Sequence, residues 1–112
     1  MKKFVCLFMG SANPARGPGD MSPDELGKGM AAWTKWMSDH AKSIKDNGGP
    51  LGKTLKTSKS GVHPAKNLVA GYVIVEAESQ EAAAKMFEGH PHFSIFPGEG
   101  VEVMEVMPIP QR

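Results

Sequence analysis

The chain has 112 residues, of which 40% are hydrophobic and 22% charged, and this composition fits one globular domain. The net charge is +1 without a dense basic stripe, and no apolar stretch approaches the roughly 20 residues of a membrane helix, so we expect neither a nucleic-acid nor a membrane partner. Cys6 is the single cysteine, which excludes an intramolecular disulfide, and we expect a soluble cytoplasmic protein.

The first predicted element is a strand over residues 2–9. Its alternate positions are apolar on both sides, which predicts a central strand covered on both faces and a buried, inert Cys6 thiol. The apolar run is too short for the core of a signal peptide. The Gly- and Pro-rich segment 10–20, "GSANPARGPGD", follows as a loop that is long enough to move or to act as a flap.

The clearest helix is predicted from Ser22 to a stop at Gly48. Ser22 and Glu25 have the spacing of a capping box, and Pro23 suits the first helical position. Apolar residues recur at steps of three and four and form one stripe for packing: Leu26, Met30, Trp33, Met37, Ala41 and Ile44.

The second half of the chain predicts three further strands and a helix. Residues 53–58 are a weak strand candidate, and the turn-rich segment 59–67 connects them to a strong strand over 68–77. A helix capped by Ser79 and stopped at Gly89 precedes a last strand within 100–110. The region 42–66 is locally basic, which suits either a solvated face or the attraction of a small anion.

The predicted order β-α-β-β-α-β indicates an α+β fold with one domain over residues 1–112. This is the ferredoxin-like arrangement, in which one antiparallel sheet carries two helices on one face. The other face of the sheet would then be a large apolar patch, which monomers avoid. We therefore expect a homodimer in which two sheets pack face to face.

Four segments of the chain resemble YCII-related proteins: "MKKFVCLFMG", "MAAWTKWMSDHAKSIKDNGG", "GYVIVEAESQEAAAKMFEGHPHF" and "VEVMEVMPI". The resemblance covers nearly the whole chain and is most specific from "GYVIVEAES" to "HPHF". It implies a protomer of the dimeric α/β-barrel superfamily, with a homodimer and a cleft beside the helices.

The resemblance implies less about activity. Some members of the family are proposed to be enzymes that use a His–Asp pair with the histidine on the first helix, where this chain has Asp39 and His40. Adjacent helical residues point about 100° apart, so Asp39 cannot easily orient His40. Many relatives carry Asp-Gly-Pro-Phe between the middle strands, whereas this chain has "SGVHPAKN" there.

The candidate catalytic residues are His92 and, second, His90, in the segment "GHPHF". Pro91 disfavours helical geometry at His90, and extended geometry would send both imidazoles to the same side. Histidine is the usual proton-transfer group near neutral pH. The alternative is a structural role, in which both rings fix the corner through bonds to loop carbonyls.

Metal binding is the rival use of this histidine pair. It would need a third ligand, drawn from His63, Asp39, His40, Glu88 or Glu99. No spacing demands such a site, and nothing specific supports haem, so we expect neither a metal nor another cofactor.

Three further residues are candidates for substrate binding. Trp36 and His40 form a row beside the apolar stripe of the first helix, and Tyr72 points into one face of the sheet. Such a row can line a pocket for a flat apolar molecule or can belong to the core or an interface. The expectation is a homodimer that binds an unknown small molecule and performs elimination or isomerisation. The alternative is a non-catalytic binding or accessory protein.

Overall fold

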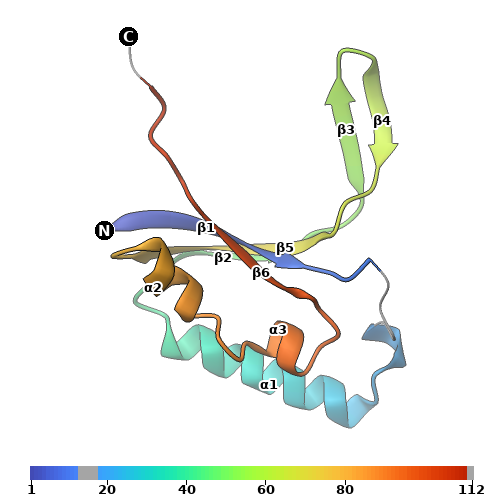
Figure 1. Cartoon of the computed structure of the whole chain (residues 1–112). Helices are drawn as coiled ribbons and strands as arrows, with labels where there is room; N and C mark the ends of the chain where they lie inside the picture. Colours follow the sequence, from blue (N-terminus) through green and yellow to red (C-terminus); the bar gives the residue numbers. More distant parts are fainter. Residues whose placement is uncertain (13–17, 111–112) are drawn as a thin grey trace.

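The computed structural model describes residues 1–12 and 18–110, and it has one four-stranded antiparallel sheet with helices on one face (Figure 1). The sheet order is β2-β5-β1-β6, formed by Ile44–Pro50, Val69–Ala77, Lys2–Met9 and Gly100–Glu105. This order confirms the ferredoxin-like α+β fold, because the first and third strands of the predicted motif lie in the centre. Of the predicted 10–20 loop, residues 13–17 lie outside the described residues.

Strand β1 is central, as the alternation of its residues predicts. Phe4, Cys6 and Phe8 are buried on the helix side, where they pack with Val73 and Val75 of β5. Burial raises the pKa of the Cys6 thiol to about 12, so the thiol is protonated and unreactive in the folded protein. The prediction of a buried core cysteine is confirmed.

Helix α1, Pro23–Asp39, starts where the sequence predicts. The Ser22 hydroxyl accepts a hydrogen bond from the Glu25 N–H at 3.1 Å, and the Glu25 carboxylate accepts one from the Ser22 N–H at 3.0 Å. Its predicted end at Gly48 is wrong, because the helix ends at Asp39 and a turn follows. The Ile44 N–H still bonds the His40 carbonyl at 3.1 Å as the chain leaves this turn.

Strand β2 begins at Ile44, so a residue assigned to the helical stripe belongs to the sheet instead. Its pairing with β5 is irregular on both sides of Asp46, and Gly48 has a positive φ of 61°. A Cβ at Gly48 would overlap the Tyr72 carbonyl. The strand therefore depends on glycine at its closest approach to β5.

The predicted strand at 53–58 exists but lies outside the main sheet. Strand β3, Thr54–Ser58, pairs with β4, Gly61–Ala65, in a separate hairpin. The segment 59–67, predicted as a connection only, thus contains the second strand of this hairpin. Figure 1 shows the hairpin projecting from the sheet on the side away from the helices.

The remaining helices are short. Helix α2, Gln80–Lys85, is capped by Ser79, whose hydroxyl accepts from the Ala82 N–H at 3.1 Å. Gly89 ends this segment with a φ of 69°, and helix α3, Pro91–Ser94, follows. A 3-10 turn, η1, spans Pro18–Asp20. Within the described residues, no helix is long and apolar enough to cross a membrane.

Candidate functional site

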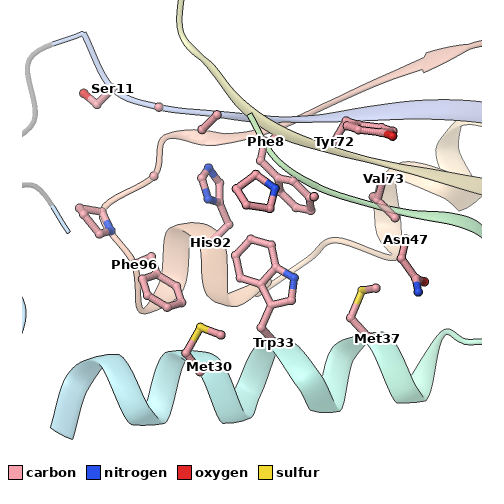
Figure 2. Close-up of a pocket in the computed structure, with 17 residues that line it drawn as sticks. Phe8, Ser11, Met30, Trp33, Met37, Asn47, Tyr72, Val73, His92 and Phe96 are labelled. Atoms are coloured by element: carbon pink, nitrogen blue, oxygen red, sulfur yellow. The ribbon is translucent and has the colours of Figure 1, made fainter. Parts of the chain in front are cut away.

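A cavity of about 620 Å³ lies between the sheet and helix α1, and its walls are mainly apolar (Figure 2). Figure 2 shows Met30, Trp33 and Met37 rising from α1 on one side, with His92 and Phe96 beside them and Phe8 on the sheet. The stripe predicted on the first helix therefore faces a cavity over part of its length, and Met30 is 61% exposed as a result.

Glycine at two positions lets aromatic rings approach the backbone closely. A Cβ at Gly29 would overlap the Phe96 ring, so this glycine sets how near the loop after α3 lies to α1. A Cβ at Gly98 would overlap the imidazole of His92. The sequence pattern gave no sign of either contact, because both join residues that lie on different elements or in a loop.

The backbone at the "GHPHF" corner is extended at one histidine and helical at the other. His90 has φ −57° and ψ 141°, which Pro91 favours, but the chain turns into helix α3 directly afterwards. His90 is the N-cap residue, and its Nδ1 accepts a hydrogen bond from the His92 N–H at 3.0 Å. The prediction of extended geometry through His92 is therefore wrong.

His92 reaches the cavity. Its Nε2 lies 2.8 Å from the Met9 carbonyl oxygen, and because a carbonyl only accepts, Nε2 carries the proton of the neutral ring. The same oxygen accepts the Glu99 N–H at 2.9 Å, so Met9 anchors both the imidazole and the start of β6. The lone pair of neutral His92 is then on Nδ1.

Nδ1 of His92 retains some exposure. Among the described residues, His90 Nε2 is the single side-chain nitrogen or oxygen that is fully buried without a hydrogen-bond partner. Nδ1 of His92 has no hydrogen-bond partner among those residues either, and it is not in that buried class. A molecule in the cavity can therefore approach an imidazole whose orientation and tautomer are already fixed.

His90 lies in the core rather than in the cavity wall. Only 1% of its surface is exposed, and its ring centroid is 4.6 Å from that of Trp33 and 4.7 Å from that of Trp36, both edge-to-face. Burial, together with the charges of His92 and His40, lowers the pKa of His90 to about 4. A neutral His90 that caps α3 supports His92 instead of contacting a cavity ligand.

Trp36 and His40 do not line this cavity. The Trp36 indole is 7% exposed, stacks on Phe87 and donates Nε1–H to the Met86 carbonyl at 2.8 Å. His40 Nδ1 donates to the Trp36 carbonyl at 2.9 Å, and Asp39 pairs with Lys35 at 2.7 Å instead of orienting His40. Trp33, assigned from sequence to the core stripe, is the tryptophan at the cavity.

Tyr72 borders the cavity from β5 together with Gly71 and Val73. Val73 is buried toward the helices, so by strand alternation the Tyr72 side chain points to the outer face of the sheet. Asn47 and Ser11 supply polar groups at other points of the wall. Of the predicted site residues, His92 and Tyr72 thus border the cavity. The other three, His90, Trp36 and His40, do not line it.

The residues around the two histidines do not gather as a metal site. Across residues 1–12 and 18–110, no group of three His, Cys, Asp or Glu side chains is placed to hold an ion. His63, one of the third ligands considered, lies on the projecting hairpin, where its Nε2 bonds the Ser60 carbonyl at 2.8 Å.

Comparison with solved structures identifies the type of fold. 5-Chloro-2-hydroxyhydroquinone dehydrochlorinase (TftG) from Burkholderia phenoliruptrix AC1100, solved in complex with 2,5-dihydroxybenzoquinone, aligns with a TM-score of 0.57 over 94% of this chain and 93% of its own. This chain therefore shares the fold of that protein. At 20% identity the likeness concerns the fold alone. No family model and no curated protein sequence matches the chain.

Proposed function

We propose that this chain is a YCII-related cytoplasmic enzyme that transfers a proton on a small molecule bound in the cavity beside α1. One observation carries the proposal: His92 stands at an apolar cavity, its Nε2–H is fixed on the Met9 carbonyl, and its Nδ1 has no hydrogen-bond partner among residues 1–12 and 18–110. A positioned imidazole is the usual general acid and base near neutral pH.

The reaction class is elimination or isomerisation. Nδ1 of His92 takes a proton from a carbon next to an electron-withdrawing group, and the freed electron pair forms a double bond. In an elimination the leaving group departs from the neighbouring carbon with its own electron pair. In an isomerisation the proton returns from His92 to a different carbon. Neither course needs a redox cofactor or a metal.

The walls favour a neutral and flat substrate. No Asp, Glu, Lys or Arg is among the described residues that line the cavity, so a charged group would be desolvated there without an opposite charge. Trp33, Phe8 and Phe96 offer aromatic surface, and about 620 Å³ accommodates one or two rings. The solved neighbour, a dehydrochlorinase in complex with a benzoquinone, supports both the ring and the elimination chemistry.

The proposed assembly is a homodimer. The outer face of the sheet, away from the helices, carries partly exposed apolar side chains on three adjacent strands: Val5, Leu7, Tyr72, Ile74 and Met104. Val5 lies between Ile74 and Met104 in the strand register, so these side chains are contiguous. A second copy would cover this patch with an identical one.

The test is proton exchange measured by NMR in D₂O, with 2-cyclohexen-1-one and chlorohydroquinone as probes. We expect the protein to accelerate the exchange of C–H protons of 2-cyclohexen-1-one for deuterium, or the release of chloride from chlorohydroquinone. We expect His92→Gln to reduce the accelerated rate by about 10²-fold or more. Glutamine can still donate to Met9 from the position of Nε2 but cannot accept a proton. An unchanged rate in a folded His92→Gln protein would refute His92 as the catalytic residue.

The second candidate function is binding without catalysis. It is favoured by the absence, among the described lining residues, of a carboxylate that could stabilise protonated His92. A binding protein would gain thermal stability from a cavity probe, in proportion to the logarithm of its concentration, without accelerating any proton transfer. A panel of probes that raises the thermal stability of the protein, without any proton exchange above the rate in buffer, would favour binding over catalysis.

A further inference from the structure

The hairpin β3–β4 stands apart from the rest of the molecule. It belongs to no other sheet, and Figure 1 shows it extending away from the body of the protomer. All but two of its ten strand residues are exposed, the exceptions being Thr54 and Ala65 at its base. A two-stranded hairpin without further support is marginally stable in water, so its persistence needs an explanation.

The hairpin has one apolar face. In the register of the two strands, Leu55 lies opposite Pro64 and Thr57 lies opposite Val62, and all four point to the same side. Leu55 is 69% exposed and Val62 is 59% exposed. The other face carries Lys56, Ser58 and His63. This alternation of apolar and polar side chains is typical of a hairpin that packs one of its faces against another surface.

The hairpin and the C-terminal segment rise from the same side of the sheet. Figure 1 shows both on the side opposite the helices, where the outer apolar face of the sheet is uncovered. The C-terminal segment, residues 106–110, includes Val106, Met107 and Ile109, which are 47%, 67% and 82% exposed. A molecule that packs on the outer face of the sheet would therefore also contact apolar residues of the hairpin and of the C-terminal segment.

The charges of these two parts are complementary. The hairpin and its flanks, residues 53–66, contain four lysines and no carboxylate, whereas β6 and the residue before it contribute Glu99, Glu102 and Glu105. Within the described residues, the four lysines form no ion pair, and neither do the exposed Glu99 and Glu102. One copy of the chain thus presents both partners of an electrostatic contact that it does not make within itself.

We propose that the β3–β4 hairpin is an intersubunit arm that lies with its Leu55 face on β6 and residues 106–110 of a second copy. The two-fold symmetry of a homodimer would make the contact twice. The inference rests on the proposed homodimer and adds to it a contact outside the sheet faces. In this arrangement, the exposed Leu55 and Val62 side chains contact the acidic and apolar edge of the second copy.

The test compares two double variants by sedimentation equilibrium. Leu55→Glu with Val62→Glu alters the apolar face, and Ser58→Glu with His63→Glu adds the same two carboxylates to the opposite face of the same hairpin. We expect the first pair to raise the dimer dissociation constant by at least about tenfold and the second by less than about threefold. Equal effects of the two pairs, or none from the first, would overturn the arm while leaving the sheet-to-sheet dimer intact. A wild-type monomer at micromolar concentration would overturn both.

Hydrogen exchange gives a readout that does not depend on hairpin variants. In the wild-type dimer we expect the amides of residues 55–64 to exchange slowly, and dilution below the dissociation constant should release them before the amides of β1 and β5. Fast exchange of residues 55–64 in a sample shown to be dimeric would refute the arm. The same experiment on a variant made monomeric by Ile74→Glu should show the free hairpin.

Discussion

His90 and His92 are two residues apart, yet the folded chain gives them opposite environments. Pro91 holds His90 extended, so its Nδ1 can cap the helix that Pro91 begins, and the next turn carries His92 to the cavity. The cap makes His90 Nδ1 an acceptor, which requires a neutral ring with its proton on Nε2. The buried histidine is thus a positioning residue, and the exposed lone pair belongs to its neighbour.

This difference predicts a pH dependence of stability. The pKa of His90 is about 4 in the folded protein, against an ordinary value of 6.5. Between pH 4 and 6.5, His90 is therefore protonated in the unfolded chain and neutral in the folded one. The contribution of neutral His90 to the free energy of unfolding is constant above pH 6.5. It is lost as the pH falls toward 4, and the total loss is about 3 kcal/mol. Urea unfolding at pH 7 and at pH 4.5 measures the loss.

The matched control for this prediction is His90→Asn. Asparagine can cap the helix and accept from the His92 N–H, but it does not titrate. We expect lower stability than wild type at pH 7, because the edge-to-face contacts with Trp33 and Trp36 are lost, and a smaller decline between pH 7 and 4.5. Equal declines in the two proteins would show that other groups cause the acid sensitivity.

The second prediction at the scale of the residue concerns Gly98. A Cβ here would overlap the His92 ring, whereas a Cβ at Gly100 meets nothing within 4 Å. Gly98→Ala should displace the imidazole from the Met9 carbonyl and reduce proton transfer by about 10²-fold, because a displacement near 1 Å has effects of this size. Gly100→Ala is the control.

Two readouts separate displacement from unfolding. Circular dichroism and urea unfolding should show a folded Gly98→Ala protein that is destabilised by about 1–3 kcal/mol. NMR should show a changed environment for the His92 ring in Gly98→Ala but not in Gly100→Ala. Full activity in Gly98→Ala would mean that the fixed orientation of His92 is irrelevant to the reaction.

At the scale of the element, the starts of α1 and α2 are predictable from the sequence, whereas the end of α1 and the start of α3 are not. Both predictable starts are marked by capping residues, Ser22 with Glu25 for α1 and Ser79 for α2. Their hydroxyl and carboxylate groups accept hydrogen bonds from nearby backbone N–H groups. The end of α1 has no comparable signal, because Ala41 and Ile44 continue the helical spacing beyond Asp39. The residues of β2 are mostly polar or glycine, and only pairing with β5 defines them as a strand.

Candidate site residues were predictable by type but not by placement. The sequence identifies histidines at the corner and tryptophans on the first helix. It does not determine whether Trp33 or Trp36 faces the cavity, since both are apolar positions within one turn of each other. That choice depends on tertiary packing, which the spacing of the residues does not contain. Trp33 lies beside Phe96 of the loop to β6, whereas Trp36 stacks on Phe87 after α2.

At the scale of the whole molecule, the protomer is a flat body of two layers with one covered and one uncovered sheet face. Its Cα atoms extend over 54 × 39 × 19 Å. Figure 1 shows the helices on one side of the sheet, and the hairpin and the C-terminal segment projecting on the other side. On the outer face, Ile74 and its neighbours in β1 are only partly buried. An apolar patch across three strands is the feature that a second sheet would remove from water.

The dimer is therefore the prediction that belongs to this scale. Ile74→Glu places a carboxylate in the middle of the outer face, where pairing of two copies would bury two like charges, and we expect a monomer at concentrations at which wild type is a dimer. Ala31→Glu makes a charge change on the exposed surface of α1 and should leave the mass unchanged. Size-exclusion chromatography with light scattering measures both. If Ile74→Glu remained dimeric with the mass of wild type, the two copies would have to associate through another surface.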